Sequence, residues 1–238
     1  MAKMFRRLVL IAAVAVMAFA LWQIYSILSE GFEDEAANHE IAEIAGDGGG
    51  SPGLIENFIG TSSYQTEEQL RAAQLRVIDF AALRAHNADI VAWISIPNTI
   101  VDYAITQTSN NEFYLHHDAF KRPSRAGAIF LDKDCPRDFS ASDTIVYGHH
   151  MRNRSMFGSL NRYADSSFAN GHRYIFIYTA QETRRYTFST AFRSGAQLDR
   201  LNNSDTQVLS LVTCNYTGGY SHFVVRANLL NVKLPGTP

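Results

Sequence analysis

The sequence is short of cysteine and of net charge, and both shortages narrow the possible functions. Only two cysteines, Cys135 and Cys214, occur in 238 residues, without a Cys-x-x-Cys pair or a Cys/His ligand cluster. A zinc site is therefore not expected, and nothing else calls for a metal or cofactor. A formal net charge of -2 argues against non-specific binding to nucleic acid, which normally needs a basic excess. The chain also lacks a repeat of the solenoid or propeller kind.

Charge is also absent from one long stretch near the N-terminus. Residues 8–28, LVLIAAVAVMAFALWQIYSIL, contain no charged side chain, and about 20 such residues cross a ~30 Å hydrocarbon core. Basic residues precede the stretch and acidic residues follow it. The sequence therefore predicts a single-pass anchor in the cell membrane, with residues 1–7 in the cytoplasm and the rest outside. A cleaved signal peptide is the alternative, because Ala18-Phe19-Ala20 resembles a cleavage site, but the apolar run continues beyond it.

A linker and a helix are predicted after the anchor. Residues 29–63 are first acidic and then rich in glycine (GDGGGSPG), as in an extracellular linker. Thr66 and Gln69 form a capping box, and apolar residues recur after them at helical spacing. An amphipathic helix is therefore predicted over residues 66–86, at the start of a folded domain that occupies residues 64–238.

Short runs rich in β-branched and aromatic residues fill most of residues 88–234. Turn residues separate most of these runs, and regular helical spacers are missing. This pattern predicts a mainly β fold, an antiparallel or mixed barrel with flanking helices, rather than a doubly wound sheet. Residues 151–169 lack a strand pattern and are predicted to hold a short helix. The eight runs are DIVAWISI, TIVDYAI, AGAIFLD, DTIVYGH, RYIFIYT, RRYTFSTAF, QVLSLVTC and SHFVVRANLL.

Cys214 is the candidate nucleophile. It ends an apolar run and precedes the polar NYTGG, so it is expected at a strand end. The thiolate is the nucleophilic form of cysteine, and it is populated when a neighbouring cation or base lowers the pKa of the thiol. An inert buried cysteine and a disulfide with Cys135 are the structural alternatives.

The partner of that thiol is sought among eight histidines. His149 and His150 directly follow the strand DTIVYG, and Gly148 is expected to permit a sharp exit from it. Adjacent side chains on an extended chain point in opposite directions, so only one of the two is expected to face the site. Among the other histidines, His116 and His117 are interpreted as loop or surface residues, and His39, His86 and His172 have no supporting context. Asp102 and Asp143 are possible carboxylate partners of His149, but they are interpreted as turn or surface residues.

Taken together, several segments resemble the sortases, and class B sortases in particular. The resemblance covers about residues 87–230 and implies a closed eight-stranded barrel of the sortase type. It also implies a cysteine transpeptidase in which Cys214 is the nucleophile and His149 the general acid and base. The two residues are then expected to meet across neighbouring strand ends. The segments are DIVAWISIPNTIVDYAI, NEFYLHHD, AGAIFLD, TIVYGHHMRNRSMFGSL and LSLVTC.

The resemblance also implies the partners. A sortase cleaves exported proteins after the threonine of a C-terminal sorting signal, which often reads Asn-Pro-x-Thr-x in class B relatives. An amine of a peptidoglycan precursor then accepts the protein. A pilin lysine is the alternative acceptor, and water would make the protein a hydrolase. A non-catalytic binding module is a third alternative, because one family residue is missing.

That missing residue is an arginine on the strand after the cysteine, which in sortases binds substrate and stabilises the oxyanion. In this sequence His222 stands at its position, just before FVVRA. Arg226 shares a strand face with His222 but lies ~13 Å further along, so only a bulge or another register would bring it to Cys214. A loop arginine beyond His149, Arg152 or Arg154, is a further alternative.

Overall fold

The computed structural model describes residues 2–46, 64–195, 206–215 and 221–233. The backbone of Cys214 belongs to this described part, whereas its side chain does not. The chain divides into two units, Met1–Ala36 and Ala37–Pro238, and the second contains the whole barrel.

Helix α1 (Ala2–Ile44) is longer than the sequence indicated. It includes the predicted anchor and continues into the first part of the predicted linker, where alanine and glutamate favour helix. In the second unit, Ile41 and Ala45 lie one helical turn apart and are buried in a cluster with Leu83. Gly46 follows the helix with φ +80, a conformation that favours glycine at a helix end. Among the described residues, no helix is both long and apolar enough to span a membrane, so the anchor stays a prediction.

The helix predicted over residues 66–86 is two helices, α3 (Glu67–Leu75) and α4 (Phe80–His86). The predicted capping box is confirmed, since Thr66 and Gln69 bond each other's backbone amides. The helix breaks at Arg76, whose backbone is extended and whose guanidinium lies 2.6 Å from the Asp102 carboxylate. Asp79 then caps α4 by accepting from the Ala82 amide at 2.8 Å. A long-range ion pair therefore overrides the local helical pattern.

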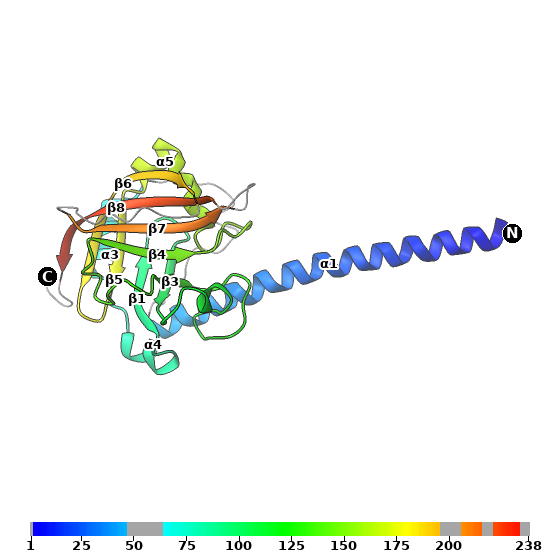
Figure 1. The fold of residues 1–238 in the computed structure, drawn as a ribbon, viewed down its shortest axis with the longest axis horizontal. Helices are drawn as coiled ribbons and strands as arrows, with labels where there is room; N and C mark the ends of the chain where they lie inside the picture. Colours follow the sequence, from blue (N-terminus) through cyan, green and yellow to red (C-terminus); the bar gives the residue numbers. More distant parts are fainter. Residues whose placement is uncertain (1, 47–63, 196–205, 216–220, 234–238) are drawn as a thin grey trace. The chain divides into compact units, whose positions relative to one another are not determined.

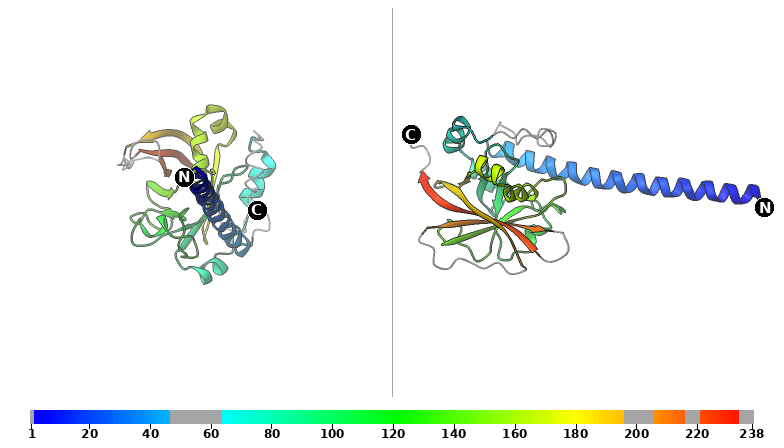
Figure 2. Two further views of the ribbon diagram at one scale, coloured as in Figure 1. Left: turned by 90° about the vertical axis from the view of Figure 1, so that its right-hand side faces the viewer. Right: turned by 90° about the horizontal axis from the view of Figure 1, so that it is seen from above.

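Eight strands form a closed barrel in the order β1-β2-β3-β4-β7-β8-β6-β5, which confirms the predicted fold class. The β2–β3 and β4–β7 pairs are parallel, and the other pairs are antiparallel. Figure 1 shows β6, β8, β7 and β4 one below another, and Figure 2 shows the same strands from two further sides. The strands are β1 (Ile90–Ser95), β2 (Asp102–Thr106), β3 (Ile129–Leu131), β4 (Asp143–Gly148), β5 (Tyr174–Tyr178), β6 (Thr183–Ser194), β7 (Val208–Asn215) and β8 (Ser221–Lys233).

Short helices and two apolar clusters complete the domain. The 3-10 helices η1 (Phe113–Leu115) and η2 (Gly158–Ala164) and helix α5 (Ser166–Gly171) interrupt the strands, and the last two confirm the helix predicted within residues 151–169. One cluster contains residues of all eight strands, and the other packs α1, α3 and α4 on β1 and β5. Burial of such side chains contributes about 1.5–3 kcal/mol each, so the ends of β4 and β7 rest on a continuous core.

Candidate active site

His149 and Cys214 continue two strands that pair side by side. In the parallel β4–β7 ladder, Gly148 is the partner of Thr213. His149 directly follows β4, and Cys214 is the next residue of β7, so their backbones lie at the same end of the barrel about one strand spacing, ~4.8 Å, apart. The predicted meeting of the two strand ends is therefore found in the backbone, while the roles of the two residues stay predictions.

The imidazole of His149 is held by a backbone group. Its Nε2 lies 2.7 Å from the carbonyl oxygen of Leu115 in η1, and the ring is half-buried. Its Nδ1 is buried and has no hydrogen-bond partner in the described part of the chain. A buried nitrogen without a partner is costly unless a ligand or a reacting group uses it.

The imidazole of His150 makes different contacts from that of His149, as expected for adjacent side chains. Its Nε2 is 2.7 Å from the Asn161 side-chain nitrogen, and its backbone forms an isolated bridge with Met156. Gly148 precedes the pair, but its backbone does not have a positive φ, so the expected sharp exit is not why glycine stands there. The reason is steric, because a Cβ at Gly148 would lie 2.5 Å from Ile129 and 2.8 Å from the ring of Phe157.

His222 lies beside Cys214 on the strand at the other side of β7. The two residues are direct partners in the antiparallel β7–β8 ladder. His222 is half-buried, and its Nδ1 has no hydrogen-bond partner within the described residues. Three adjacent strands therefore bring His149, Cys214 and His222 to one end of the barrel.

Arg226 lies elsewhere on the ladder, because no bulge shifts β8 toward Cys214. Its ladder partner on β7 is Ser210, four residues before Cys214. The guanidinium donates to the Ser210 hydroxyl (3.3 Å) and lies 3.8 Å from the carboxylate of Asp143. It also lies 5.1 Å from the ring of Phe192. The structure thus places this arginine in a buried polar cluster and does not bring it to the two strand ends.

Neither candidate carboxylate contacts His149. Asp102 binds Arg76 and accepts from the Trp93 indole nitrogen at 2.9 Å. Asp143 accepts from the Ser210 hydroxyl at 2.7 Å. Both are buried or nearly so, which differs from the turn or surface location that the sequence favoured, because each pairs with a distant arginine.

The other candidates have structural surroundings. His117 stacks on Phe113, with ring centroids 4.0 Å apart, and its Nδ1 bonds the Phe113 carbonyl. Arg152 and Arg154 are exposed in the loop after His149. Cys135 is buried in the core, and its Sγ lies 3.7 Å from the carbonyl oxygen of Asp143.

Comparison with known proteins gives the family. The model of the sortase domain matches residues 94–230, more than half of the chain. The chain belongs to the sortase family. The matched region runs from the end of β1 into β8 and so includes most of the barrel.

Individual relatives place this sortase near class B. It is 41% identical over 90 residues to sortase B of Listeria monocytogenes, over 38% of this chain and 37% of that protein. It is 35% identical over 96 residues to sortase B of Staphylococcus aureus, over 40% of this chain and 39% of that protein. These matches span well under half the length of both curated relatives. The crystal structure of Bacillus anthracis sortase B superposes with a TM-score of 0.58 at 28% identity, covering 64% of this chain and 84% of the other.

One contact of His149 was not predicted from the sequence, that with the carbonyl of Leu115. It is a backbone group, which every residue type has, so the residue type does not identify it. It also lies 34 residues before the histidine that it contacts. The only signal near it was the segment NEFYLHHD, which contributed to the resemblance. The imidazole of His149 thus contacts a backbone oxygen, whereas the candidate carboxylates Asp102 and Asp143 bond other groups.

Proposed function

We propose that this sortase is a membrane-anchored cysteine transpeptidase that acts on C-terminal sorting signals. The observation that carries the proposal is the parallel pairing of Gly148 with Thr213, directly before His149 and Cys214. An imidazole and a thiol on adjacent strand ends form the minimal arrangement for nucleophilic catalysis by cysteine. The unpartnered Nδ1 of His149 supports the assignment, because it is a nitrogen available for proton transfer.

The chemistry follows from these two groups. A thiol has an ordinary pKa of about 8.5, so His149 first takes the thiol proton of Cys214 to form the thiolate. The thiolate attacks the carbonyl carbon of the threonine in the sorting signal. As the C–N bond breaks, His149 returns the proton to the leaving amine. An acceptor amine then attacks the thioester and loses a proton to His149, and Cys214 leaves as the thiolate.

The oxyanion of the tetrahedral intermediate needs a hydrogen-bond donor. We assign this role to His222, because it is the ladder partner of Cys214 and its Nδ1 lacks a partner among the described residues. Arg226 is the weaker candidate, since its guanidinium already bonds Ser210. Removal of one oxyanion donor typically lowers the rate by about 10²–10³-fold.

The substrate and location are part of the same proposal. The substrates are exported proteins with a C-terminal sorting signal of the Asn-Pro-x-Thr-x kind, cleaved after the threonine. The acceptor is an amine of a peptidoglycan precursor, and a pilin lysine is the alternative. Residues 8–28 anchor the chain in the membrane, with the barrel outside the cell, because this stretch is uncharged and follows basic residues.

A mass measurement tests the proposal. The full chain in detergent micelles is incubated with a sorting peptide and an equal mixture of a wall-type amine and a lysine peptide. We expect a peptide thioester on Cys214, with none on Cys214→Ala, and the ligated product identifies the acceptor. Cys135→Ala is the matched control, since Cys135 is buried in the core, and it should still form the thioester. A thioester on another residue, or none at all, would contradict the proposal.

A further inference from the structure

The contact of His149 with η1 determines which ring nitrogen of the neutral imidazole has the hydrogen. A carbonyl oxygen can only accept a hydrogen bond, so the 2.7 Å contact with Leu115 requires a hydrogen on Nε2. In the neutral imidazole the lone pair is then on Nδ1. This is the ring nitrogen that is buried without a partner in the described residues. The backbone of η1 therefore selects one tautomer of the imidazole.

The Leu115 carbonyl belongs to a short helix, η1, that is fixed at its start and by the residues before β3. Asn110 accepts from the amides of Glu112 and Phe113 at 2.9 Å each, at the start of η1. The Tyr114 carbonyl accepts from the Ala128 amide at 2.9 Å, just before β3. Gly127 permits this close approach, since its φ is +61 and a Cβ there would collide with the Tyr114 carbonyl and lie 2.9 Å from that of Leu115.

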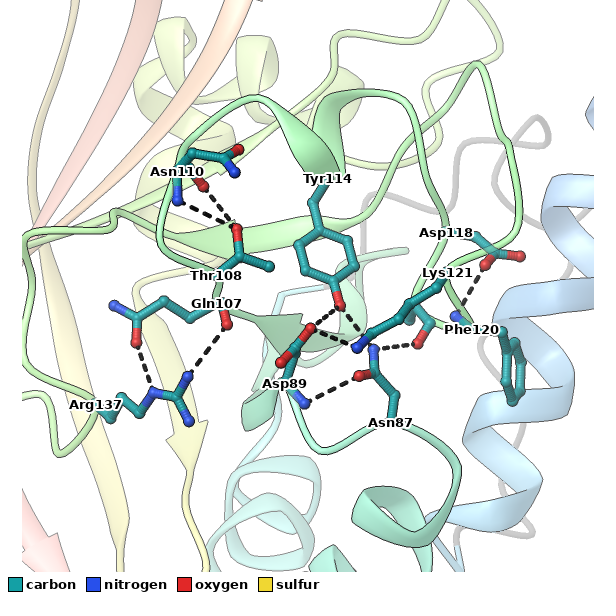
Figure 3. Close-up of polar contacts among 11 residues, drawn as sticks. Asn87, Asp89, Gln107, Thr108, Asn110, Tyr114, Asp118, Phe120, Lys121 and Arg137 are labelled. Carbon is teal, nitrogen blue, oxygen red and sulfur yellow. Dashed lines mark hydrogen bonds and ion pairs between the residues drawn. The ribbon is translucent and has the colours of Figure 1, made fainter.

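The side chain of Tyr114 fixes η1 from within the core. Its ring is 1% exposed, and its hydroxyl accepts from the Asn87 amide nitrogen at 2.8 Å and donates to Asp89 at 3.0 Å (Figure 3). Lys121 lies 2.8 Å from the same Asp89 oxygen, and Asn87 also donates to the Ala119 carbonyl at 2.8 Å. Burial raises the pKa of Tyr114, so the hydroxyl keeps its proton. The hydroxyl thus ties η1 to Asn87 and Asp89 before β1, and these two residues in turn bind the loop after η1.

We propose that Tyr114 is a positioning residue that keeps the Leu115 carbonyl on Nε2 of His149, so that Nδ1 is the nitrogen that exchanges protons during acyl transfer. Tyr114 acts through the backbone of η1 and does not touch the reacting atoms. The proton-transfer role rests on the proposed function. The tautomer does not, since it follows from the Leu115 contact alone.

The tautomer is measured directly by nitrogen NMR. The full chain is labelled with ¹⁵N-histidine in micelles, and His149 is assigned from the signals that are lost in His149→Gln. We expect neutral His149 to carry its hydrogen on Nε2, and Tyr114→Phe to give a mixture of both tautomers. Gly127→Ala would place a Cβ 2.9 Å from the Leu115 carbonyl oxygen, so it should displace that carbonyl and produce the same mixture. This second variant keeps the test valid if Tyr114→Phe does not fold.

Tyr178→Phe is the matched control. Tyr178 is equally buried, and its hydroxyl donates to the Ala73 carbonyl at 2.8 Å, but it lies on β5, away from β4 and β7 in the barrel order. Tyr114→Phe should lower kcat about 10–100-fold with KM for the sorting peptide unchanged. Tyr178→Phe should leave both kcat and KM at their wild-type values. A hydrogen on Nδ1 of neutral His149, or equal effects of the two variants, would overturn the proposal. A wild-type protein with the Nε2–H tautomer but no acyl transfer would count against the proposed function alone.

Discussion

His222 is the direct cross-strand partner of Cys214. The resemblance to sortases leads us to expect an arginine at the position of His222. The exchange alters the chemistry of the position. A guanidinium is always charged and offers five donors, whereas an imidazole has an ordinary pKa of about 6.5 and can donate through one N–H when neutral. The candidate site therefore has imidazoles on both sides of the cysteine's strand, since His149 directly follows β4 and His222 lies on β8.

The first prediction concerns His222. His222→Ala should lower kcat/KM for ligation of a sorting peptide by about 10²–10³-fold, because the oxyanion loses a donor. His222→Arg should retain most of the activity, since a guanidinium supplies donors at the same ladder position. The readout is product formation followed by mass spectrometry. His86→Ala, an exposed histidine in α4, is the control and should match the wild type. Full activity in His222→Ala would show that another group stabilises the oxyanion.

The second prediction concerns the buried polar cluster around Arg226. Asp143 is 3% exposed at its side chain and lies 3.8 Å from the Arg226 guanidinium, which is 13% exposed. Asp143→Ala removes the carboxylate that faces a buried cation, which costs about 3–5 kcal/mol of unfolding free energy. Urea denaturation measures the loss. Asp134→Ala is the control, because its side chain is 60% exposed and should change stability by no more than about 0.5 kcal/mol. Equal losses in the two variants would show that the Asp143 cluster adds no stability.

The barrel was predictable because its strands carry their own local signal. Runs of β-branched and aromatic residues bounded by turn residues marked all eight strands. The positions of Cys214 and His149 at strand ends were predictable for a related reason, since each follows an apolar run. Strand pairing itself has no such signal, but the family resemblance supplied it.

Features set by distant contacts were not predictable. The helix over residues 66–86 breaks at Arg76 because Asp102, 26 residues away, binds its guanidinium. The buried place of Arg226 depends on Asp143 and Ser210, which lie on two other strands. The Leu115 carbonyl is a backbone group whose position is decided by tertiary packing. A single sequence read locally contains none of these contacts.

The third prediction concerns stability against pH. His172 is buried and stacks on Phe168, and burial lowers the pKa of His172. The unfolded chain, with an ordinary histidine pKa of about 6.5, then binds more protons than the folded protein below that pH. Stability should therefore fall as the pH drops from about 6.5 toward the lower folded value. His172→Gln does not titrate, so the difference in unfolding free energy between variant and wild type should shrink on going from pH 8 to pH 5. A difference that stays constant would contradict this linkage.

The fourth prediction tests why glycine stands before His149. A Cβ at Gly148 would lie 2.5 Å from a methyl carbon of Ile129 and 2.8 Å from the ring of Phe157, and both side chains are buried. Gly148→Ala should therefore lower the unfolding free energy by about 1–3 kcal/mol through overpacking. It should also lower kcat, because the end of β4 shifts together with His149. Gly195→Ala is the matched control, since no atom lies within 4 Å of its added Cβ. Thermal unfolding and ligation kinetics of both variants separate the two effects. If Gly148→Ala is as stable as Gly195→Ala, the side chains of Ile129 and Phe157 can move to accommodate the Cβ, and the steric explanation is wrong.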